Sequence, residues 1–171
     1  MTSSKNVQAL CRTLSEEYIL QLKTQNFHWN VEGPSFFSLH KLFEEQYKEI
    51  SELVDRAAEV IRAHNVKAPG SFKEFQKIAL IDEAPAEALT SLQMIEILSK
   101  DHHSLAVRLG EHLEEAEKIN DTAAVVLYED LISFHEKAAW MIRSHRNPEI
   151  YSNASTNRSG TKPVYADRGV N

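Results

Sequence analysis

The chain has 171 residues, a net charge of −6 and 42 % hydrophobic residues, proportions typical of one globular domain. Glycine and proline together make up only about 6 % of the chain, against a usual ~12 %, which disfavours a loop-rich β architecture. The single cysteine excludes an internal disulfide, no apolar run reaches the ~18 residues of a membrane span, and no signal peptide is visible. We therefore expect a cytoplasmic protein without a membrane partner.

Four long segments repeat apolar residues at the spacing of an amphipathic helix, with turn-forming residues between them. Ser35 is positioned to cap the second segment, and the run from Asn120 to Thr122 predicts a turn and an N-cap before the fourth. The second and third segments are separated by a connection of about 20 residues that contains a short amphipathic piece. The predicted helices cover residues 5–30, 36–65, 72–80, 86–118 and 122–146.

This pattern predicts an all-α fold, a four-helix bundle with a short extra helix in the long connection between the second and third long helices. We place the bundle in residues 1–146, with Trp140 in its core. Residues 147–171 are rich in Ser, Asn, Thr and Gly, a composition typical of a flexible tail.

Histidine is unusually frequent, with eight residues in the chain, and one of them, His40, aligns with carboxylates along one face of the second predicted helix, while His28 lies near the end of the first. If His40 is set at 0° and each residue advances by about 100°, three acidic residues fall between about 40° and 100°, beside the apolar face. Imidazole and carboxylate groups together suit iron, manganese or zinc. The candidate ligands are His28, His40, Glu44, Asp55 and Glu59.

Distance separates these ligands into two groups. His40 and Asp55 are 15 residues apart, which is roughly 22 Å along a helix, whereas a metal–ligand bond is about 2 Å. Either the chain carries two separate half-sites, or a second, antiparallel copy brings its Asp55 and Glu59 against His28 and His40. We predict the shared site, with two equivalent sites at a two-fold interface. Spacing alone also leaves open a solvated helix face without metal.

Ordinary di-iron bundles use Glu-x-x-His pairs that point into the core of one subunit. No histidine of this chain has a glutamate three positions before it, so the sequence does not support that centre. The other histidines lack a partner at ligand spacing, and we expect packing or surface roles for them. They are His64, His102, His103, His112, His135 and His145.

The run from His28 to Gly33, followed by Leu39-His40 and Glu44, resembles the signature of the Dps family, the mini-ferritins described as DNA-binding proteins from starved cells. Asp55, Ala58 and Glu59 match its second part. The resemblance extends over nearly all of residues 5–146. Departures lie at Ala57, Val60 and His64, and they affect packing and surface charge more than the ligands.

The resemblance implies a ferritin-like subunit in a hollow dodecamer with ferroxidase centres between two-fold-related subunits. His28 and His40 would come from one subunit and Asp55 and Glu59 from its partner, with Glu44 as an additional acidic ligand. Fe²⁺ would be oxidised, typically by hydrogen peroxide, and the ferric product stored as mineral. Trp29 matches an aromatic residue that takes up stray oxidising equivalents; a packed interface aromatic is the alternative.

Iron entry is expected at an acidic corner of the subunit. Residues 111–130 carry seven acidic side chains and one lysine, and the family lines three-fold pores with acidic groups from this corner. Acidic rings concentrate cations, and Asp121 and Asp130 are the candidates. A solvated helix end, with Asp121 as N-cap, is the alternative.

DNA binding has little support in the sequence. Only Lys5 precedes the first helix, and the tail has a net charge of +1, so few phosphates could be neutralised and binding would be weak and salt-sensitive. The alternative function is a DNA-binding, nucleoid-protecting shell with little ferroxidase activity. A zinc- or manganese-dependent hydrolase would need a Ser/Cys–His arrangement that we do not find.

Overall fold

The computed structural model describes residues 2–146 and contains five helices and no strand in that range. The four long helices are α1 (Thr2–Asn30), α2 (Phe36–Ala63), α4 (Ser91–Lys118) and α5 (Thr122–Arg143). The short helix α3 (Phe72–Ile78) lies in the long connection, as predicted. The predicted tail, residues 147–171, lies outside the described residues.

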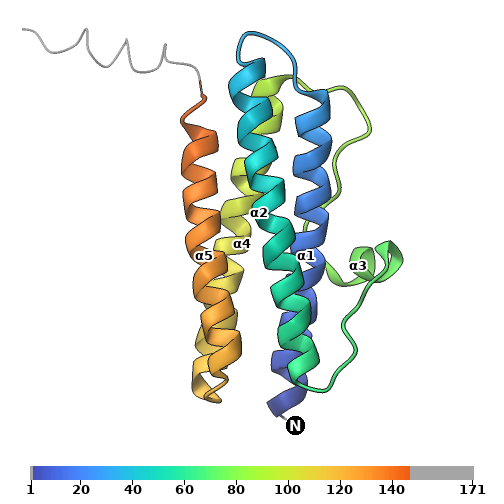
Figure 1. Ribbon diagram of the computed structural model, residues 1–171, viewed down its shortest axis with the longest axis vertical. Helices are drawn as coiled ribbons and strands as arrows, with labels where there is room; N and C mark the ends of the chain where they lie inside the picture. The colour runs from blue at the N-terminus through green and yellow to red at the C-terminus, as the bar shows by residue number, and fades with distance from the viewer. Residues whose placement is uncertain (1, 147–171) are drawn as a thin grey trace, which may run out of the picture.

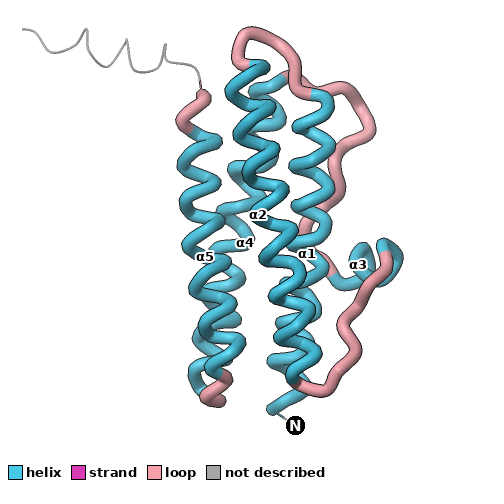
Figure 2. The backbone as a smooth tube through the Cα atoms, viewed as in Figure 1, coloured by secondary structure: helices cyan, strands magenta, loops and turns pink. Residues whose placement is uncertain are grey.

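The long helices form a bundle in which α1 pairs with α2 and α4 pairs with α5 as two antiparallel hairpins (Figure 1). The long connection leaves the lower end of α2, packs α3 against α1, and climbs to the upper end, where α4 begins (Figure 2). Because of this crossover, α2 and α4 run in the same direction, while α1 and α5 lie at opposite sides of the bundle. No helix among residues 2–146 is long and apolar enough to cross a membrane.

Helix boundaries follow local capping chemistry and differ from the predicted ones by up to five residues. Thr90 forms a capping box with Gln93, so α4 begins at Ser91 rather than at residue 86. Asp121 accepts a hydrogen bond from the Ala124 amide, which confirms the predicted N-cap of α5. The predicted Ser35 cap is wrong: the Ser35 side chain makes no capping hydrogen bond.

The core is formed by the apolar stripes that the helical periodicity predicts. Fully buried members come from each long helix, including Leu10, Phe43, Leu98 and Leu131. Trp140 was expected in the core, but its side chain is 61 % exposed on α5. Burying the apolar side chains on one face of each long helix is the main stabilising contribution to the bundle.

Candidate metal centre

His28 and His40 lie side by side where the end of α1 meets the start of α2. His28 Nδ1 donates to the His40 carbonyl oxygen at 2.8 Å, and His40 Nδ1 donates to the His28 carbonyl oxygen at 2.8 Å. A carbonyl oxygen can only accept, so both rings carry their proton on Nδ1. In the neutral rings, the Nε2 lone pairs are therefore both available for a metal ion.

Aromatic stacking holds the two imidazoles in this orientation. The ring centroids of His28 and His40 are 3.9 Å apart with nearly parallel planes. Phe36 also stacks on His40, at 5.0 Å, and Tyr47 meets His28 edge-on at 5.4 Å. Ring contacts thus restrain both candidate ligands within the single subunit.

Trp29 follows His28 but is not part of the core. Its indole is 59 % exposed in the single subunit, whereas the His28 side chain next to it is buried. An indole of this size exposed beside a buried ligand is consistent with both roles considered for Trp29, as an interface aromatic and as an electron donor near the metal.

Glu44 lies one turn after His40, and its carboxylate is held by two lysines. Lys41 and Lys48 donate to its two oxygens at 2.9 and 2.6 Å. The hydrogen bonds from Lys41 and Lys48 lower the pKa of Glu44 to about 2, so it is ionised at neutral pH. To serve as the additional acidic ligand, Glu44 has to exchange these lysines for the ion.

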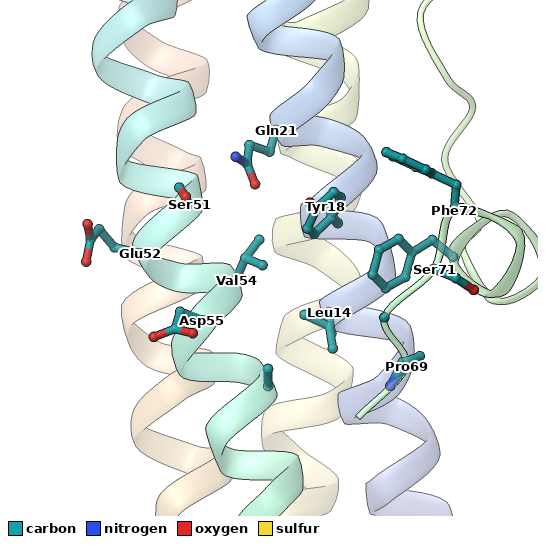
Figure 3. Close-up of a pocket in the computed structure, with 13 residues that line it drawn as sticks. Leu14, Tyr18, Gln21, Ser51, Glu52, Val54, Asp55, Pro69, Ser71 and Phe72 are labelled. Carbon is teal, nitrogen blue, oxygen red and sulfur yellow. The ribbon is translucent and has the colours of Figure 1, made fainter. Parts of the chain in front are cut away.

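Asp55 and Glu59 lie farther along α2, and both are exposed. Within residues 2–146 neither forms a hydrogen bond or an ion pair, although the neighbouring Arg56 pairs with Asp130 at 2.6 Å. Figure 3 shows the Asp55 side chain leaving α2 on the side turned away from α3. Two unpaired carboxylates one turn apart repel each other and favour a cation between them.

A groove of about 520 Å³ opens beside Asp55 between α2, α1 and α3. Its walls include Leu14 and Tyr18 from α1, Val54 from α2 and Phe72 from α3 (Figure 3). The groove is thus partly apolar, with the carboxylates of Glu52 and Asp55 at its edge.

The structure does not bring the two ligand groups together within one chain. α2 is an uninterrupted helix from Phe36 to Ala63, so His40 and Asp55 remain roughly 22 Å apart along its axis. Among the described residues, no three His, Cys, Asp or Glu side chains are grouped so that they could hold a metal ion. One subunit thus presents a nitrogen half-site and a carboxylate half-site.

The two pore candidates have partners within the subunit. Asp121 caps α5, accepts a hydrogen bond from Asn6, and lies 2.9 Å from Nε2 of His64. Asp130 is half exposed and pairs with Arg56. The capping role of Asp121 is shown, whereas its role in a pore, and that of Asp130, stays a prediction.

A second histidine cluster lies in the interior, and the sequence did not reveal it. His102 Nδ1 is 2.8 Å from His135 Nδ1, and His135 Nε2 is 2.7 Å from a carboxylate oxygen of Glu17. All three side chains are fully buried. Their helices α1, α4 and α5 meet only in the tertiary structure, so no spacing within one helix could have predicted the cluster.

Comparison with known proteins identifies the family to which this fold belongs. A family model described as the ferritin-like domain matches residues 7–148. The DNA protection during starvation protein 2 of Bacillus anthracis is 36 % identical over 141 residues, which are 82 % of this chain and 96 % of that protein. The chain belongs to the Dps family of ferritin-like proteins.

Solved Dps structures agree with this assignment. Dps from Staphylococcus aureus has a TM-score of 0.80 and 31 % identity, covering 84 % of this chain and 96 % of that one. The Dps protein of Vibrio cholerae, described as a member of a broad superfamily of ferritin-like diiron-carboxylate proteins, has a TM-score of 0.79 and 29 % identity, covering 84 % and 89 %. The predicted family and fold are thereby confirmed.

Proposed function

We propose that this Dps-family protein is a ferroxidase that oxidises Fe²⁺ with hydrogen peroxide at sites shared between two copies and stores the ferric product inside a dodecameric shell. The observation that carries this proposal is the pair of imidazoles whose Nδ1 protons are bound to each other's carbonyl oxygens. Both Nε2 atoms are left available as ligands, and His40 lies roughly 22 Å from the unpaired Asp55 along α2.

An antiparallel second copy completes the site. If two α2 helices pack about a two-fold axis that passes near residues 47 and 48, His40 of each chain faces Asp55 of the other. The groove beside Asp55 then has room for the exposed aromatics near the partner's histidine pair. Each dimer contains two such sites, each with two nitrogen and two carboxylate ligands.

The proposed chemistry balances around a pair of iron ions. Two Fe²⁺ supply two electrons, which with two protons reduce one H₂O₂ to two water molecules and leave two Fe³⁺. Delivering both electrons to one peroxide avoids the one-electron step that yields hydroxyl radical. Imidazole nitrogens and carboxylates suit both oxidation states of iron, and Glu44 is ionised to help with the second ion once its lysines move away.

Mixing two inactive variants tests the shared site. His40→Ala and Asp55→Asn should each abolish rapid oxidation of Fe²⁺ by peroxide, followed by stopped-flow absorbance. Co-expressed at equal levels, they should regain about a quarter of the wild-type rate, because half of random dimers are mixed and each mixed dimer has one intact site.

His103→Gln serves as the control, since His103 is exposed and lies on α4 away from the pair. A site contained within one chain would give no recovery on mixing, and full activity of either single variant would refute the assigned ligands.

Relatives in Bacillus anthracis and Deinococcus radiodurans are named DNA protection during starvation proteins. We propose that this protein protects DNA indirectly, by consuming Fe²⁺ and peroxide together, because its net charge of −6 gives it little attraction to phosphates. A gel shift with the full chain at moderate salt should show no retarded DNA, whereas DNA strand breakage by Fe²⁺ and peroxide should fall when the protein is added. Retardation would favour the alternative DNA-binding shell.

A further inference from the structure

The interior cluster of Glu17, His135 and His102 is the most unusual feature of the bundle outside the proposed iron site. The contact between Glu17 and His135 joins α1 to α5, the helices at opposite sides of the bundle, so it passes through the interior (Figure 1). His102 extends the chain of contacts to α4. All three side chains have no exposed surface or almost none.

The distance between the His102 and His135 rings limits how many protons can lie between them. Two ring nitrogens 2.8 Å apart share a single proton, because a second proton would force two N–H groups against each other. His135 Nε2 is committed to Glu17. Nε2 of His102 and the second oxygen of Glu17 are buried and have no hydrogen-bond partner. The cluster is therefore not organised around a metal ion, since His135 uses both nitrogens on protein groups.

The surroundings oppose a second positive charge. Burial, followed by the nearby charges of His135 and Lys23, keeps the pKa of His102 well below its usual range. Lys23 is itself buried and paired with Asp101 at 2.7 Å, which leaves Glu17 as the carboxylate that contacts the histidines. On α5, next to His135, Phe134 packs edge-on against the His102 ring.

We propose that Glu17, His135 and His102 form one proton-binding unit that makes folding of the subunit sensitive to acid: the core has room for one proton between the two imidazoles but not for two. In the unfolded chain both histidines are free to be protonated. Acid therefore favours separation of α4 and α5 from α1, independently of whether the subunit oxidises iron.

The sign and size of the effect follow from proton linkage. The folded state resists protonation of His102, so the stabilisation is fully present above the ordinary histidine pKa of about 6.5 and is lost as the pH falls below it. For each proton that binds to the unfolded chain but not to the folded chain, the unfolding equilibrium constant rises about tenfold for every unit by which the pH falls.

The test compares His102→Gln with His103→Gln by equilibrium unfolding of the full chain in urea between pH 8 and pH 5. Glutamine keeps a polar group beside His135 but cannot be protonated, and His103 is the exposed neighbour of His102. We expect the unfolding constant of wild type and His103→Gln to rise about tenfold more per pH unit below 6.5 than that of His102→Gln. Parallel pH profiles for all three proteins would overturn the proposal.

Two further measurements keep the proposal testable if His102→Gln does not fold. Deuterium exchange at the imidazole C2 position, read by mass spectrometry, should show folded His102 neutral at pH 5.5, with the exposed His103 as the internal comparison. Glu17→Gln removes the carboxylate that contacts His135 Nε2, so it should move the acid transition to higher pH. Normal titration of His102 in the folded protein, or a lower acid midpoint in Glu17→Gln, would refute the proton-binding unit.

Discussion

At the scale of single residues, the proposed iron site depends on orientation as much as on the presence of the ligands. The pattern along the chain and the family resemblance predict His28, His40, Asp55 and Glu59 as ligands, and this stays a prediction. The reciprocal hydrogen bonds that fix the Nδ1 protons could not be predicted, because they join two backbone carbonyls to rings 12 residues away. The lysines on Glu44, by contrast, stand three residues before it and four residues after it on α2, a spacing that the sequence itself contains.

Tyr47 gives a direct test of ligand orientation. It contacts His28 edge-on, so Tyr47→Leu should loosen that ring and weaken binding of Co²⁺, used as a probe for Fe²⁺, by about tenfold. Tyr47→Phe keeps the ring and should bind normally. The measurement is a titration followed by the visible absorption of the cobalt complex, with circular dichroism confirming the fold. Equal losses in the leucine and phenylalanine variants would point to the hydroxyl group instead.

At the scale of helices, sequence periodicity located every element among residues 2–146, and side-chain caps mark the starts of α3, α4 and α5. The third long helix was predicted from residue 86 because Leu89 and Leu92 fit its apolar spacing, but the Thr90 capping box starts it at Ser91. At the start of α2, by contrast, the expected cap residue Ser35 is present, but its side chain makes no capping hydrogen bond. Caps depend on backbone angles that the side-chain pattern alone does not contain.

The capping box predicts a measurable stability effect. Thr90→Ala removes the hydroxyl that accepts from the Gln93 amide, and we expect a loss of about 1 kcal/mol in the free energy of unfolding. Thr122→Ala, an exposed threonine in the first turn of α5, is the matched control and should change stability by less than about half of that. Urea unfolding of both variants at pH 7.5 measures the difference, and equal losses would show that the cap contributes nothing specific.

At the scale of the whole molecule, the net charge of the chain can be assigned to one region. Residues 111–130 account for a net charge of −6, equal to that of the chain, and they include the end of α4 and the start of α5. The sequence could place this charge on one corner of the subunit, but it could not show that Asp121 is tied to His64 and Asn6 or that Asp130 is paired with Arg56.

The effect of negative charge at this corner can be measured separately from the capping of α5 by Asp121. Asparagine caps helices about as well as aspartate, so an Asp121→Asn, Asp130→Asn double variant should keep α5 intact while removing two negative charges per subunit. We expect slower iron uptake in a mineralisation assay, with unchanged Co²⁺ affinity at the dimer site. Uptake at the wild-type rate would assign Asp121 to capping alone and place the entry route elsewhere.

Because α2 is continuous between His40 and Asp55, the proposed site limits insertions and deletions in this stretch. Inserting one residue between His40 and Asp55 would turn the carboxylates by about 100° relative to the histidines. In the proposed dimer both sites share the same two helices, so one insertion would misalign both. This stretch is therefore expected to accept substitutions but no change in length, whereas the connection from residue 64 to residue 90 has no such register to keep.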